Sequence, residues 1–153
     1  MDAHFRLIPE AIALSDASDK EAVLAQLAQQ FERAYGFAAA DVREALDERE
    51  KLGSTGFGRG VAIPHARLAD TKRPVAALLK LASPVEFDAA DGMPVELVFG
   101  LISPENAGAA HLHALAAISR LMRDEATHRM LVEAADVEAL VASFTNANDL
   151  DAA

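Results

Sequence analysis

The chain has 153 residues and a mass of 16.2 kDa, which suffices for one domain that needs neither a disulfide nor a metal to fold. It contains no cysteine, so disulfides, iron–sulfur clusters, thiolate zinc sites and a cysteine nucleophile are excluded. Its 14 basic and 24 acidic residues give a net charge of −10, which argues against nucleic acid as a partner because nucleic acid is normally met by clustered Lys and Arg.

Two helices are predicted near the N-terminus. The first begins with Ser18 as N-cap and Glu21 three residues later, the spacing of a capping box, and ends at Gly36. The second ends at Gly53, which can take the left-handed position after a helix. The apolar positions recur at helical spacing: Val23, Leu24, Leu27, Ala28 and Phe31 in the first helix, and Val42, Ala45, Leu46 and Leu52 in the second.

The middle of the chain changes to short apolar runs bounded by Pro, Asp-Gly and Ser-Pro, which is typical of strands. Four strands are predicted, at 61–65, 75–81, 85–87 and 95–102. The run at 95–102 is too continuously apolar for a strand with one solvent-exposed face. We therefore expect helices on both of its sides.

Helical periodicity returns after Pro104. One long amphipathic helix carries the stripe Leu112, Leu115, Ala116, Ile118, Ser119 and Met122. Two shorter helices follow near 125–134 and 137–144, and Asp136 caps the last one. Helices, then strands, then helices predict an α/β layered domain with a central sheet. No span crosses a membrane and no secretory signal precedes the domain, so a cytoplasmic location is expected.

The densest chemical pattern is the segment from Gly53 to Gly60, which holds four glycines in eight residues. It does not match a phosphate-binding P-loop, because Arg59 and Gly60 stand where Lys and Ser or Thr are required. It does not match the dinucleotide fingerprint either, since the spacing differs and no helix follows. A flexible surface turn is the structural alternative to a functional loop.

This loop leads directly into Ile63, Pro64 and His65. Proline fixes its own φ and holds the preceding residue extended, so the backbone before His65 is stiff. A histidine aimed in this way can be a metal ligand, a general base, a nucleophile or a packed ring bonded to a carbonyl.

A second candidate is the pair His111 and His113 on the long helix. Residues two apart on a helix point in different directions, so only one can face a given site. His111 lies on the side of Leu115, and we expect it to face inward and His113 outward. His65, His111 and a carboxylate could make a zinc site, although no ligand spacing supports one. The remaining histidines, His4 and His128, are interpreted as surface residues.

Arg49 closes the second helix just before the glycine loop. It can be a solvated residue favoured at a helix C-terminus, or a cation held toward His65, since its planar fork suits phosphate oxygens. Arg59 and Arg67 flank the loop and His65, and they could attract an anion or a partner protein, although the sequence supports this less strongly than it does for Arg49.

The run Glu-Arg-Glu-x-x-Gly-Ser-Thr-Gly that begins at Glu48, the Ala-Ile-Pro-His block that ends at His65, and the distant His111-Leu112 pair together resemble a known family. They are similar to the IIA phosphocarrier domains of the bacterial phosphotransferase system, of the fructose–mannitol type, and most closely to its nitrogen-regulatory branch. The likeness covers about residues 7–144 of a single domain that we expect to span 1–153.

The resemblance implies a mixed sheet flanked by helices on both faces. It also implies that His65 is the phosphorylated histidine, His111 the second active-site histidine and Arg49 the arginine near the phosphoryl group, with no cofactor and no metal. It gives Arg67 no role. Glycine-loop N–H groups, His111 and Arg49 are expected to stabilise the transferred group.

The implied donor is a small histidine-phosphorylated carrier protein. The implied targets are regulated proteins, such as potassium-transport components or sensor kinases. Three alternatives stay open: a sugar-specific IIA that passes the group to a separate IIB protein, a metal-dependent hydrolase that uses His65 and His111, and a binding module without covalent chemistry.

Overall fold

The computed structural model describes residues 4–147. The helices are the 3-10 turn η1 (Pro9–Ala11), α1 (Lys20–Tyr35), α2 (Ala39–Lys51), α3 (Ala109–Arg123), α4 (Glu125–Glu133) and α5 (Val137–Ala147). The strands are β1 (Ile12–Ser15), β2 (Gly56–Gly58), β3 (Val61–Ala62), β4 (His65–Leu68), β5 (Val75–Val85) and β6 (Val95–Pro104). None of the helices within 4–147 has the length and apolar character needed to cross a membrane.

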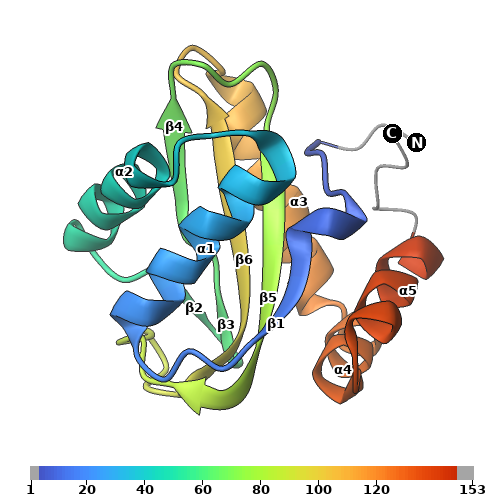
Figure 1. The fold of residues 1–153 in the computed structure, drawn as a ribbon. Helices are drawn as coiled ribbons and strands as arrows, with labels where there is room; N and C mark the ends of the chain where they lie inside the picture. The colour runs from blue at the N-terminus through green and yellow to red at the C-terminus, as the bar shows by residue number, and fades with distance from the viewer. Residues whose placement is uncertain (1–3, 148–153) are drawn as a thin grey trace.

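The strands form one mixed six-stranded sheet in the order β1-β5-β6-β3-β2, and β4 also pairs with β6. β5 and β6 are antiparallel, whereas β3 and β4 both run parallel to β6, one after the other along its length. Helices cover both faces: Figure 1 shows α1 in front of the strands and α3 behind them. The predicted α/β fold, with a mixed sheet between helices, is confirmed.

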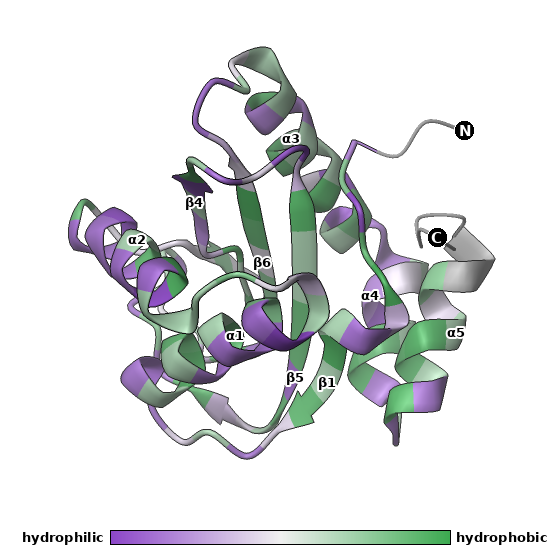
Figure 2. Cartoon of the chain, turned by 45° about the horizontal axis from the view of Figure 1, so that its top comes forward, coloured by the Kyte–Doolittle hydropathy of each residue, from purple (hydrophilic) through white to green (hydrophobic). Residues whose placement is uncertain are grey.

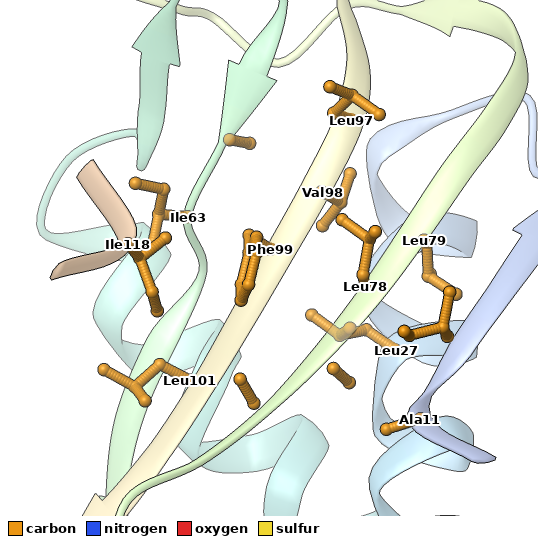
Figure 3. Close-up of a cluster of buried hydrophobic side chains, with 14 of the residues drawn as sticks. Ala11, Leu27, Ile63, Leu78, Leu79, Leu97, Val98, Phe99, Leu101 and Ile118 are labelled. Carbon is orange, nitrogen blue, oxygen red and sulfur yellow. The ribbon is translucent and has the colours of Figure 1, made fainter. Parts of the chain in front are cut away.

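The central strand β6 is buried on both faces, as its apolar run predicted. Phe99 contacts Phe5 and Phe144 edge-on, with ring centroids 5.7 and 5.8 Å apart, so it belongs to the face that α5 covers. Gly100 points the other way, where an added Cβ would lie 2.8 Å from Leu27 of α1. Figure 3 shows Phe99 beside Ile118 of α3 on one side of the strand and Val98 on the side of Leu27.

The outer surface of α2 is polar. Figure 2 shows α2 mostly hydrophilic and the central strands hydrophobic. Val42 and Leu46 are the buried residues of α2, and Ala45 is half-buried. Leu52, predicted to lie on the apolar stripe, is instead 84% exposed because the helix has ended at Lys51.

The N-cap of α1 was predicted one residue too early. Asp19, not Ser18, has the extended cap conformation and accepts a hydrogen bond from the Ala22 N–H at 2.7 Å. Aspartate is as good an N-cap as serine, so residue type alone could not decide between Ser18 and Asp19. At the other end Gly36 has a φ of 84° and closes the helix, as predicted.

The strand boundaries differ from prediction in three places. The predicted strand at 61–65 is broken at Ile63 and Pro64 into β3 and β4, because proline supplies no N–H for a ladder. The predicted strand at 75–81 continues as β5 to Val85, with a register irregularity before Val85, and residues 86–87 of the other predicted strand lie outside the sheet. Two short strands, β1 and β2, were not predicted.

The C-terminal helices lie close to their predicted positions. The predicted cap of α5 is confirmed, since Asp136 Oδ1 accepts from the Ala139 N–H at 2.8 Å. On α3 the buried residues are His111, Ala114, Ile118 and Met122. Leu112 is 62% exposed and Ala116 is also exposed, so their placement on the apolar stripe was wrong.

Candidate functional site

His65 is the first residue of β4, directly after the break in the sheet. The Pro64 carbonyl accepts from the Leu101 N–H of β6 at 2.9 Å, and His65 itself is in register with Leu101. Ile63 and Pro64 are both buried. The backbone that carries His65 is therefore fixed by the central strand on one side and by proline on the other.

The ring of His65 is half-buried, and its Nδ1 lies 2.8 Å from the Ile63 carbonyl oxygen. A carbonyl can only accept, so Nδ1 carries the proton and Nε2 keeps its lone pair. Burial lowers the pKa of His65, and the charge of Arg49 lowers it further. The bond to Ile63 and the charge of Glu50 act in the opposite direction. The neutral form, which is the nucleophilic one, is thus favoured at neutral pH.

His111 of α3 faces His65, with ring centroids 5.6 Å apart and ring planes inclined by 49°. It is buried, and its Nδ1 lies 2.7 Å from Oγ of Ser103, a fully buried residue of β6. Burial lowers the pKa of His111 to about 4, and the charges of Arg67 and His65 add to this effect. When the Ser103 hydroxyl donates to Nδ1, the Nε2–H of His111 is free to donate to an anion at the site.

His113 lies outside this arrangement. It is exposed, as expected, and its ring meets that of the exposed His4 at a centroid distance of 5.8 Å. The structure therefore brings His65 and His111 together and leaves His113 apart from them.

Arg49 is half-buried at the end of α2, and its Nη1 donates to the Gly53 carbonyl at 2.9 Å. Its charge lowers the pKa of His65. Arg67, which the sequence placed beside His65 and to which the family resemblance gave no role, is exposed. Its Nη1 donates to the Glu105 carbonyl at 3.5 Å, and its charge lowers the pKa of His111. Residues two apart on a strand share a face, which is consistent with a position near His65.

Three N–H groups of the glycine loop, which was expected to stabilise the transferred group, have hydrogen-bond partners within the protein. The Gly53 N–H bonds the Glu50 carbonyl, and the Thr55 N–H bonds the Glu50 carboxylate. The Gly56 N–H bonds Ser54 Oγ at 3.0 Å. These three donors are therefore already used within the loop and at the end of α2.

Arg59 is hydrogen-bonded to residues at the junction of α3 and α4. Its backbone has a φ of 59°, and its N–H donates to Asp91 Oδ2 at 2.9 Å. Its guanidinium donates to the Arg123 carbonyl at 3.3 Å, and its own carbonyl accepts from Nε2 of His128 at 3.0 Å. His128, interpreted from the sequence as a surface residue, is half-buried and hydrogen-bonded.

The zinc hypothesis requires a third ligand beside the two facing histidines. Within the described part of the chain, no three His, Asp or Glu side chains gather as a metal would need. His65 and His111 thus stand without a carboxylate ligand of their own.

His65 keeps an unprotonated Nε2 and faces His111, and the charges of Arg49 and Arg67 lower the pKa values of His65 and His111, respectively. Hollows of about 530, 620 and 240 Å³ lie elsewhere, lined by residues other than these four. A half-exposed ring that lines none of these three hollows suits a reacting group presented by another macromolecule better than a small enclosed substrate.

Comparison with known proteins agrees with this chemistry. Residues 7–147 match the family model described as "Phosphoenolpyruvate-dependent sugar phosphotransferase system, EIIA 2". The chain is 44% identical over 134 residues to a nitrogen regulatory protein of Bradyrhizobium diazoefficiens, covering 86% of this chain and 87% of that one. It is 45% identical over 122 residues to the nitrogen regulatory protein of Pseudomonas aeruginosa, covering 79% of each.

Solved structures give the same result. The crystal structure of the nitrogen regulatory protein IIA-Ntr from Neisseria meningitidis superimposes with a TM-score of 0.82 at 37% identity, covering 90% of this chain and 94% of that one. The IIA mannitol structure from Escherichia coli shares the fold, with a TM-score of 0.74 at 22% identity over 91% of this chain and 99% of that one. The chain belongs to the EIIA 2 family of the phosphoenolpyruvate-dependent sugar phosphotransferase system.

Proposed function

We propose that this protein is a phosphoryl carrier of the nitrogen-regulatory branch, and that His65 accepts the phosphoryl group. The single observation that carries the proposal is the hydrogen bond from Nδ1 of His65 to the Ile63 carbonyl, which leaves Nε2 as the nucleophile. The donor is a small carrier protein that bears a phosphohistidine.

The reaction exchanges one N–P bond for another. The Nε2 lone pair of His65 forms a bond to phosphorus while the N–P bond of the carrier breaks. The carrier ring, protonated at its other nitrogen, leaves as a neutral imidazole, and His65 keeps its Nδ1–H as a phosphoimidazolium. A loose phosphoryl transfer of this kind needs positioning and charge stabilisation. Arg49 and Arg67 supply positive charge, and His111 supplies a neutral donor that does not repel them.

The regulatory role rests on the relatives. The nitrogen regulatory proteins of B. diazoefficiens and P. aeruginosa are matched over 87% and 79% of their lengths. We infer that the free and phosphorylated forms bind different target proteins, with potassium-transport components and sensor kinases as the kinds of target to test. Adding a doubly charged group at His65 would change the charge of the surface that a target contacts.

A sugar-specific role is the second candidate. The chain is 37% identical over 99 residues to the fructose-specific EIIABC component of Bacillus subtilis. That match covers only 16% of the relative, so it concerns one part of a larger protein. In this case His65 would pass the group on to a separate IIB protein.

The test is phosphorylation with phosphoenolpyruvate, enzyme I and the carrier protein. We expect one phosphate per chain, stable to base and labile to acid, on wild type and none on His65→Ala. Label on the His65→Ala variant would contradict the assignment of the nucleophile. Rapid loss of the label to an added IIB protein would favour the sugar-specific role.

A further inference from the structure

Glu50 is a nearly buried carboxylate beside the candidate site. Its side chain is 6% exposed and pairs with Nζ of Lys20 at 2.8 Å. Both oxygens accept from the Thr55 N–H at 3.2 Å, and Oε1 also accepts from the Thr55 hydroxyl. A buried charge is costly unless it is paired and hydrogen-bonded, and this one is both.

The bonds of Glu50 continue toward His65. Thr55, which Glu50 holds by its N–H and its hydroxyl, accepts with its carbonyl from the Ile63 N–H at 2.9 Å. Ile63 in turn accepts with its carbonyl from Nδ1 of His65 at 2.8 Å. An unbroken series of contacts thus runs from the Lys20–Glu50 ion pair to the ring that carries the nucleophilic nitrogen.

The ion pair is poorly placed to stabilise its own helices. Glu50 lies in the last turn of α2, where the helix dipole disfavours a negative charge, and Lys20 is the first residue of α1, where it disfavours a positive one. Buried ion pairs are also no more stable, as a rule, than apolar side chains of similar size. The position of Glu50 is therefore better explained by its hydrogen bonds to Thr55 in the loop than by any stabilisation of the helices.

We propose that Glu50, anchored by Lys20, is a positioning residue that fixes the loop before His65 and thereby the orientation and tautomer of its ring. The inference rests on the proposed function of His65 in phosphoryl transfer. Arg49 bonds the same loop at Gly53, so two consecutive side chains hold it. In agreement, the negative charge of Glu50 raises the pKa of His65 and opposes the effect of Arg49.

The decisive variant is Glu50→Gln, which keeps the size of the side chain and removes its charge. Glu48→Gln is the matched control, since Glu48 is an exposed carboxylate of the same helix. Lys20→Met removes the anchor instead of the carboxylate. We expect Glu50→Gln and Lys20→Met to slow phosphoryl uptake roughly tenfold, because small displacements of a nucleophile are costly, and Glu48→Gln to leave it unchanged.

Nitrogen-15 NMR of the His65 imidazole separates positioning from a general loss of structure. In Glu50→Gln we expect the Nδ1–H tautomer to lose population and the pKa of His65 to fall, with an unchanged backbone spectrum away from the loop. Glu50→Asp, which keeps the charge, should restore part of the Nδ1–H tautomer population and part of the His65 pKa. Wild-type tautomer and pKa in Glu50→Gln, with or without slower uptake, would overturn the proposal.

The NMR measurement uses the unphosphorylated protein. Failure of wild type to accept a phosphoryl group would therefore defeat the proposed function, while the tautomer would still decide whether Glu50 positions the ring.

Discussion

The two facing histidines have different environments, and the difference assigns them different tasks. His65 is half-buried and bonded to a carbonyl, whereas His111 is buried against a hydroxyl. The carbonyl fixes the tautomer of His65 and leaves the Nε2 lone pair that the proposed phosphoryl transfer requires. The hydroxyl of Ser103 can donate to His111, which leaves the Nε2–H of that ring as the donor that we propose for the transferred group.

Replacement of His111 by alanine should slow phosphoryl uptake by about a hundredfold, the effect of removing one donor to developing charge. His113→Ala is the matched control, because His113 lies two residues away on the same helix but is exposed, and it should change little. The measurement is the rate of labelling from the phosphorylated carrier, with thermal melting to confirm folding. A larger loss in His113→Ala would contradict the choice of inward face.

Replacement of Arg49 by alanine should slow uptake without unfolding the chain. The guanidinium is half-buried near His65 and bonds one loop carbonyl, so its loss removes charge at the site and little packing. Arg33→Ala, an exposed arginine in the last turn of α1, serves as the control for net charge. Equal uptake rates for the Arg49→Ala variant and wild type would leave Arg49 without the proposed role.

At the scale of elements, the caps allow a direct comparison between sequence and structure. Asp19→Ala should lower the free energy of unfolding by about 1 kcal/mol, because it removes the acceptor for the Ala22 N–H. Ser18→Ala should have little effect, since Ser18 precedes the cap. Chemical denaturation measures the free energy of unfolding of each variant. The opposite order would show that Ser18 caps the helix in solution.

Long periodic elements could be predicted from the sequence, and short ones could not. The apolar run at β6 and the helical spacing of α1 and α3 extend over ten residues or more, so one misplaced residue does not hide the period. β1 and β2 have four and three residues, and β2 includes two glycines, so neither shows a pattern. These strands exist because β5 and β3 offer them partners, which is a tertiary effect.

The candidate site was predictable where one segment carries it. The stiff Ile63-Pro64 segment aimed His65, and helix geometry separated His111 from His113. Glu50 and Ser103 were missed because their contribution depends on contacts across the fold, with Lys20 and with the ring of His111. No local spacing shows that a residue of β6 will lie under a residue of α3.

At the scale of the whole molecule, the site histidines make stability depend on pH. Both have a folded-state pKa below the ordinary value of 6.5, mainly because burial disfavours the charged ring. For each histidine, the unfolded chain therefore binds more protons than the folded one at pH values between the folded-state pKa and the unfolded-state pKa. The free energy of unfolding rises with pH in that window. The contribution is complete above pH 6.5 and is lost as the pH falls toward 4.

For His111, whose pKa is lowered to about 4, the loss between pH 7 and pH 4 amounts to at most about 3 kcal/mol. Asp91 and Asp124 also have lowered pKa values, through hydrogen bonds, but they act below the ordinary carboxyl range and outside most of this window. Denaturant unfolding of wild type and His111→Gln at several pH values tests the effect. Glutamine does not titrate, so the variant should lose less stability on acidification, and the two curves should converge toward pH 4. Because the net charge of −10 affects both proteins alike, parallel curves between pH 6.5 and 4 would mean that His111 is not held neutral by the fold.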